Sequence, residues 1–176
     1  MGGRAPIGPD EGVARTLGRL IPAALHELAN PLLALTGSAE LASREAEPRT
    51  KLHAHLTTVQ RMGDELTEIV RALQAFARLQ QEPPARLALA DEAERAVALV
   101  RRVGIARGVE LTVRREAEPE VVAAPGSVGS ELVALLLDGL AAPDRSGTVV
   151  LVVSRQDEDA VAAVAGAGEL RLAAAA

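Results

Sequence analysis

The first part of the chain carries apolar residues in a helical rhythm. Between about Glu11 and Glu45 they recur at spacings of three and four residues, at Leu17, Ile21, Ala24, Leu28, Leu32 and Leu35. At about 100° per residue these six fall within an arc of roughly 80°, which predicts one amphipathic helix with an inward stripe. Pro22 and Pro31 each remove an amide donor, so we expect a bend near each of them and not two separate helices.

A second helical pattern follows a short connection that contains Pro48. It extends from about Thr50 to Leu79, and its apolar stripe comprises Leu52, Leu56, Val59, Leu66, Val70 and Leu73, widened by Met62, Ile69 and Phe76. Two long helices joined by a short loop predict an antiparallel hairpin. A lone hairpin leaves such wide stripes half uncovered, which favours a dimeric four-helix bundle. Packing on the second half of the chain would satisfy the stripes equally.

The pattern changes after the stretch QQEPPAR at residues 80–86, which reads as a linker. We therefore expect a hairpin domain over 1–80, a linker over 81–86 and a second domain over 87–176. The second domain is predicted to contain helices near 91–107 and 127–142, and strands near 109–114, 121, 148–154 and 160–165. This is an α+β arrangement, with helices on a small mixed sheet. The acidic run at 157–159 predicts a hairpin turn, and the tail that ends in four alanines is expected to fray.

Composition narrows the function classes. The 176 residues include no Cys, Trp or Tyr, and 19 basic against 24 acidic side chains give a net charge of −5. The lack of Cys excludes a disulfide scaffold, a thiolate metal site and a Cys nucleophile. The acidic balance argues against nucleic-acid binding. No apolar run is long enough to span a bilayer, and the N-terminus lacks the apolar segment of a signal peptide, so we expect a cytoplasmic protein without a membrane partner.

One short segment of the first helix carries candidate chemistry. Measured from Leu35 at zero, His26 lies at about 180°, opposite the inward stripe, and so projects into solvent. Three further residues share this face, at about 160° to 220°: Leu33, Gly37 and Asn30. An exposed imidazole beside the Glu27 carboxylate, with an amide one turn on, suits phosphoryl transfer, in which the neutral imidazole is the nucleophile. The spacing alone is weak evidence and favours an ordinary solvated helix face.

The residue identities in this segment are a more specific signal of function than their spacing. Residues 25–41, LHELANPLLALTGSAEL, resemble the H-box of bacterial sensor histidine kinases, and the flanking LGRLIPAAL and IVRALQAFARL resemble that family's dimerisation and phosphotransfer hairpin. The resemblance implies that His26 accepts the phosphoryl group and that the hairpin dimerises into a four-helix bundle. It also implies that Glu27 and Asn30 match the acid-x-x-Asn arrangement with which family members dephosphorylate response regulators.

The second half resembles the family's ATP-binding α/β-sandwich domain in layout, but its chemistry departs from the pattern. Asp138 takes the place of the Asn that holds Mg²⁺, or Gly139 does if the register shifts by one residue. The segment VAGAGEL keeps Gly166 and Gly168 but has no Asp before them to recognise adenine, and it reads as a tight turn. Only eight residues follow Gly168, too few for an ATP lid. We therefore expect a degenerate nucleotide site that binds no cofactor or metal itself.

These observations predict a dimeric histidine phosphotransferase, which relays phosphoryl groups between the receiver domains of response regulators through His26. Leu33 and Gly37 would contact the receiver, together with the N-terminal half of the second helix, and Mg²⁺ would come with the receiver. Three alternatives stay open. They are a response-regulator phosphatase that uses Glu27 and Asn30, a non-catalytic dimeric scaffold, and a sensor histidine kinase or fragment that still binds ATP.

Overall fold

The computed structural model describes residues 9–48, 50–106, 108–141 and 147–175. The chain divides into two compact units, Met1–Ala77 and Arg78–Ala176. The side chains of residues 9–24 and of Glu27 lie outside the described part, so the expected inward placement of Leu17, Ile21 and Ala24 is untested.

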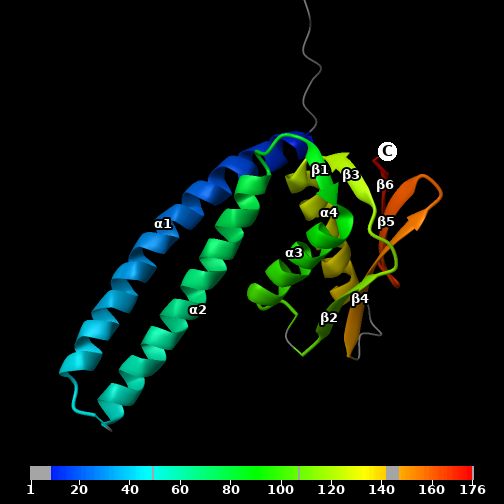
Figure 1. Cartoon of the computed structure of the whole chain (residues 1–176). Coiled ribbons are helices and arrows are strands. Elements are labelled where there is room, and N and C mark those ends of the chain that lie inside the picture. Colours follow the sequence, from blue (N-terminus) through cyan, green and yellow to red (C-terminus); the bar gives the residue numbers. More distant parts are fainter. Residues whose placement is uncertain (1–8, 49, 107, 142–146, 176) are drawn as a thin grey trace, which may run out of the picture. The chain divides into compact units, whose positions relative to one another are not determined.

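The first unit is a helical hairpin. Helix α1 (Pro9–Glu45) and helix α2 (Lys51–Leu79) run side by side (Figure 1). Helix α1 continues through Pro22 and Pro31 as one helix, as expected. Helix α2 starts where it does because the Thr50 hydroxyl accepts the amide proton of His53 at 3.2 Å, which caps one of the free donors of the first turn.

Small residues line the contact between the two helices. Helix α2 buries Gly63, Val70 and Ala77, and helix α1 buries Leu25 and Ala39. The helices approach closely at Gly63, where an added Cβ would lie 2.5 Å from Oγ1 of Thr36. A side chain at position 63 would have to displace the Thr36 hydroxyl, and this contact pairs the two positions across the hairpin.

The second unit contains two helices and six strands: β1 (Ala85–Ala88), α3 (Leu89–Arg102), β2 (Glu110–Arg115), β3 (Glu120–Ala123), α4 (Pro125–Ala141), β4 (Thr148–Gln156), β5 (Asp159–Val164) and β6 (Gly168–Ala173). Strands β1 and β3 pair antiparallel as a two-stranded sheet. The larger sheet has the order β2-β4-β5-β6, in which β2 and β4 are parallel and the other pairs antiparallel. The expected α+β class, a helical hairpin followed by a small α/β domain, is confirmed.

The core of this unit lies between α3, α4 and one face of the larger sheet (Figure 1). Its fully buried large side chains are all aliphatic and include Leu89, Leu132, Leu136, Leu151 and Val153. Arg115 joins the end of β2 to α3 by ion pairs with Glu94 at 2.7 Å and Asp91 at 3.1 Å. Aliphatic side chains thus fill the core without a large aromatic residue, and these ion pairs link β2 to α3 beside it.

Two sequence-based boundaries change in the structure. Helix α3 ends at Arg102 and not near residue 107, because Gly104 adopts a φ of 73° and its amide donates to the Arg101 carbonyl at 3.1 Å. The residues before Leu87 were expected to be a linker, but β1 already begins at Ala85.

The expectation that the C-terminal tail frays is wrong for the alanines that the structure describes, residues 173–175. Residues 168–173 form β6, which pairs with β5 along its length. Ala174 then bridges Val121 of β3, and the amide of Ala175 donates to the Glu120 carbonyl at 2.6 Å. The tail is held by backbone hydrogen bonds, which alanine side chains do not oppose. The acidic run forms the predicted β4–β5 turn, with Asp157 at a φ of 55°.

Candidate functional site

One face of α1 gathers the residues that the sequence singles out. His26, Asn30, Leu33 and Gly37 follow one another at spacings of four, three and four, and α1 is continuous through all of them. His26 and Asn30 are exposed, and Leu33 is 71% exposed. An added Cβ at Gly37 would meet nothing within 4 Å. The backbone of Glu27 lies in the same helix, but its side chain is outside the described residues.

The arrangement leaves the His26 imidazole open to a large reactant. A histidine can attack a group carried by another protein only if its imidazole is exposed. Gly37 has no side chain, which leaves space for a second protein to approach this face. An apolar side chain as exposed as Leu33 is a plausible anchor in such a contact. The face can thus present a nucleophile, an amide and an apolar contact in one line.

A second open face of the hairpin is apolar. Five large side chains on it are between 38% and 54% exposed, and we name them the apolar seam: Leu28, Leu35, Val59, Met62 and Leu66. Leu28 lies three residues after buried Leu25, and Leu66 lies three residues after buried Gly63, a rotation of about −60° in each helix. Because the helices are antiparallel, rotations of equal sign lead to the same side of the hairpin.

The sequence analysis had placed these seam residues on inward stripes, and of the stripe residues whose side chains the structure describes only Val70 is buried. The structure separates the stripe into a part covered by the other helix and a part left open. A spacing of seven residues, from Leu28 to Leu35 and from Val59 to Leu66, is the sequence signal that could have made this distinction, since it is typical of helix bundles that supercoil.

The positions that match the nucleotide site lie on α4 and on the β5–β6 turn. Asp138 is exposed on α4. Its neighbour Gly139 is buried, and an added Cβ there would lie 2.6 Å from Cγ1 of Val164. Gly166 and Gly168, with φ values of 79° and 136°, shape the predicted tight turn, and Gly168 packs near Leu135 of α4. Only residues 165–167 separate β5 from β6, so no loop long enough to cover a nucleotide stands between these strands.

Within the ranges that the structure describes, no three His, Asp or Glu side chains are grouped closely enough to hold a metal ion. Among the described helices, none combines the length and the apolar character that a membrane span requires.

The hairpin matches a known protein family. Residues 16–82 match the family described as His Kinase A (phospho-acceptor) domain, and this range contains the whole His26 face. None of the curated proteins matches the sequence closely enough to count as a relative.

Solved structures resemble more of the chain. Full-length ShkA, crystallised in complex with AMPPNP, is 20% identical, with a TM-score of 0.50 over 85% of this chain and 33% of ShkA. A structure described as a bacterial phosphotransferase is 17% identical, with a TM-score of 0.51 over 85% of this chain and 66% of that one. The chain thus spans a third of the first structure and just under two thirds of the second, and at these identities the likeness concerns the fold.

The hairpin match and the fold likeness extend across both units of the structure. The hairpin therefore matches the His Kinase A (phospho-acceptor) domain, and the fold of the hairpin and the α/β unit together is similar to parts of these two solved structures.

Proposed function

We propose that the protein is a histidine phosphotransferase of two-component signalling, which passes phosphoryl groups through His26 between the receiver domains of response regulators. The observation that carries the proposal is the exposed His26 on a continuous helix, inside the residues that match a phospho-acceptor domain. Asn30, Leu33 and Gly37 on the same face would contact the receiver.

The transfer is a pair of displacements at phosphorus. The unprotonated nitrogen of the His26 imidazole attacks the phosphorus of a receiver's aspartyl phosphate, so that an N–P bond forms and the acyl O–P bond breaks. The receiver's aspartate leaves as a carboxylate, and the imidazolium proton passes to solvent or to the Glu27 carboxylate. A second receiver's aspartate then attacks the phosphohistidine and restores the imidazole. Mg²⁺ would be held by the receiver's acidic pocket.

Three features of the second unit support a source of phosphoryl groups other than ATP. The β5–β6 turn is too short to form a lid, and no Asp precedes it. Gly139 packs against Val164 and can hold no metal through a side chain. Asp138 is solvated, with no described acidic partner grouped around it for a metal. The unit would then act as a docking surface or brace.

The apolar seam supports a homodimer. Five half-exposed large side chains on one face of a hairpin would cost solubility if they stayed open, and a second copy would cover them with the same residues. Their seven-residue spacing suits a four-helix bundle. The seam and the His26 face lie on different sides of the hairpin, so pairing through the seam would leave both His26 residues accessible.

The deciding experiment is transfer from purified receiver domains that carry ³²P on aspartate. We expect acid-labile, base-stable label on the wild type with at least one receiver of the panel, and none on His26→Ala. The matched control is His55→Ala, since His55 is also exposed on the hairpin but on α2. Failure of the wild type to take label from any donor would overturn the proposal.

Other outcomes identify other functions. Loss of receiver phosphate with inorganic phosphate released, retained in His26→Ala and lost in Asn30→Ala, would indicate a phosphatase. Labelling of His26 by [γ-³²P]ATP would indicate a kinase. A stable dimer that binds receivers without chemistry would indicate a scaffold.

A further inference from the structure

The register of the hairpin places one arginine of α2 level with His26. The close contact between Thr36 and Gly63 sets the register, and Ser43 Oγ approaches Nδ1 of His53, three residues from the level that this register gives, at 3.5 Å. His26 stands ten residues before Thr36 in α1, and the tenth residue after Gly63 in antiparallel α2 is Leu73. Arg71 is two residues from this level, about 3 Å along the helix axis.

Arg71 also lies on the same side of the hairpin as His26. His26 follows buried Leu25 by one residue, a rotation of about +100° away from the helix contact. Arg71 follows buried Gly63 by eight residues, a rotation of about +80°. Equal signs in antiparallel helices mean the same side, opposite the apolar seam. Packed helices lie about 8–10 Å apart, a gap that an arginine side chain can reach across.

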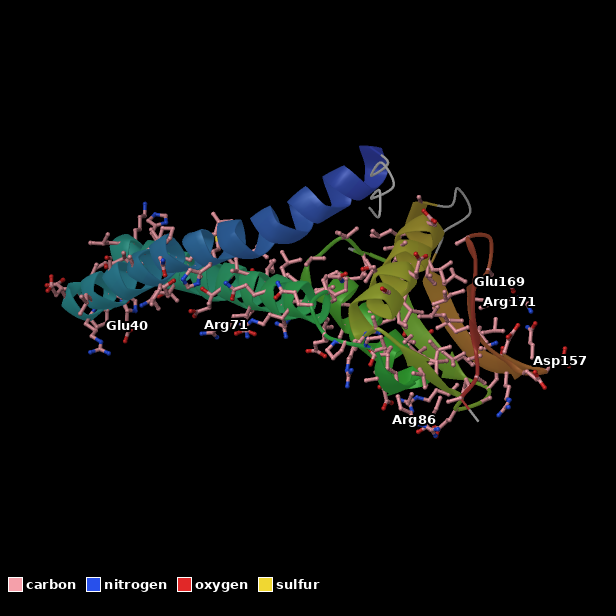
Figure 2. The ribbon with its side chains drawn as sticks, turned by 90° about the horizontal axis from the view of Figure 1, so that it is seen from above. Glu40, Arg71, Arg86, Asp157, Glu169 and Arg171 are labelled. Atoms are coloured by element: carbon pink, nitrogen blue, oxygen red, sulfur yellow. The ribbon has the colours of Figure 1, made fainter. Side chains whose placement is uncertain are left out.

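The Arg71 guanidinium is free to change partners. Its side chain is 67% exposed and extends outward from α2 (Figure 2). Its recorded partner is Glu68 of the same helix, at 3.0 Å, and that carboxylate is 47% exposed. Solvated ion pairs of this kind are weak, so a phosphoryl group with up to two negative charges would compete well for the guanidinium.

We propose that Arg71 binds the phosphoryl group on phosphorylated His26, as its electrostatic partner from the second helix. This inference rests on the proposed function. The planar guanidinium can donate two parallel N–H···O bonds to phosphoryl oxygens, which neutral side chains cannot match. Arg71 makes and breaks no covalent bond. It favours the phosphohistidine over the free histidine, because phosphorylation converts a neutral imidazole into an anionic group beside it.

The test compares Arg71→Gln, Arg71→Lys and a matched control, Arg61→Gln. Arg61 is also on α2, 62% exposed and paired with a carboxylate of its own helix, but it lies about 18 Å from the level of His26 along the helix axis. The full-length proteins are incubated with a labelled receiver until His26 occupancy is constant. The phosphoproteins are then separated from the receiver, and the loss of label is followed over time.

We expect Arg71→Gln to lower the equilibrium occupancy of His26 about three- to tenfold and Arg61→Gln to leave it unchanged. Arg71→Lys should restore part of the occupancy, because it keeps the charge but not the two parallel N–H···O bonds. High salt should reduce the difference in His26 occupancy between Arg71→Gln and the wild type, because it screens the attraction between the guanidinium and the phosphoryl group. Equal occupancy in Arg71→Gln and wild type would overturn the inference alone, whereas an unlabelled wild type would overturn the proposed function as well. Melting curves exclude a folding defect, because a purely structural role would not alter the occupancy of proteins that are equally folded.

Discussion

Gly126 allows a close backbone contact because it has no side chain. It stands in the first turn of α4, directly against the chain that leaves α2. An added Cβ would lie 2.5 Å from Cα of Gln80 and 2.6 Å from the Leu79 carbonyl oxygen, both backbone atoms. The Gln80 amide then fixes the contact by donating to the Gly126 carbonyl and to the Ser130 hydroxyl, each at 3.0 Å.

We predict that Gly126→Ala destabilises the second unit by about 1–3 kcal/mol, because backbone atoms cannot move aside at low cost. In a domain of this size this corresponds to about 4–8 °C in Tm for each kcal/mol, measurable by calorimetry. The control is Gly37→Ala on α1, where a Cβ meets nothing and helix propensity should stabilise the hairpin by up to about 1 kcal/mol. Unchanged stability of Gly126→Ala would contradict the close packing.

Glu92 makes stability depend on pH. Its side chain is 3% exposed in the first turn of α3, and burial raises the pKa of its carboxyl above the usual 4.5. Arg95, at 2.5 Å, opposes the rise in pKa, while Asp91 and Glu82 add to it. The folded state therefore holds this proton more tightly than the unfolded chain does. Its contribution to stability is full below the unfolded value and is lost as the pH rises through the folded one.

We expect Glu92→Gln to raise the Tm of the second unit at neutral pH, because the amide removes the cost of a buried charge. The gain over wild type should shrink as the pH falls toward about 4, where the wild-type carboxyl is protonated as well. Thermal melts across this pH range check the prediction. A difference in Tm that does not vary with pH would show that Arg95 fully compensates the Glu92 carboxylate.

At the scale of elements, the two helices of the hairpin present chemically opposite faces. The apolar seam is one of them, and the line from His26 to Gly37 is the other. The faces can be tested separately, because each offers a leucine that is largely open to solvent: Leu66 on the seam and Leu33 on the His26 face.

Leu66→Glu should abolish the proposed dimer, since two copies would bury like charges against each other. Analytical ultracentrifugation measures this directly. Leu33→Glu is the matched substitution and should leave the dimer intact while it slows transfer from receivers, by about tenfold if Leu33 anchors the contact. Dimers of Leu66→Glu as stable as those of the wild type would show that the seam is covered by something other than a second copy.

At the scale of the whole molecule, the question is whether both units take part in nucleotide chemistry. A protein that binds a ligand only in its folded state gains RT ln(1 + [L]/Kd) in stability. We expect millimolar ATP with Mg²⁺ to shift the Tm by less than about 1 °C, because the short β5–β6 turn cannot cover a nucleotide. A shift of several degrees would mean that the second unit still binds ATP, and would favour the kinase alternative.

Much of the fold could be predicted, because long helices and strands rich in β-branched residues have recognisable local sequence patterns. The hairpin and four of the six strands, β2 to β5, follow from apolar periodicity and turn residues. Strand β6 was missed because a run such as GELRLAAAA has no strong strand signal of its own. It becomes a strand through the backbone hydrogen bonds that β5 and β3 offer it. Helix α3 was overextended because Gly104 was not recognised as its stop.

The sequence by itself determined the chemistry of the candidate site. It identified His26, the face of the first helix on which His26 lies, and the residues that share this face. It could do so because all four members of the His26 face belong to one helix, whose periodicity fixes their relative directions. Only the tertiary structure decided which residues of the two helices are covered within the chain. Contacts between helices depend on how closely the backbones approach, and here a glycine facing a threonine sets that distance. The same register brought Arg71 level with His26, a relation between residues 45 positions apart that no local pattern records.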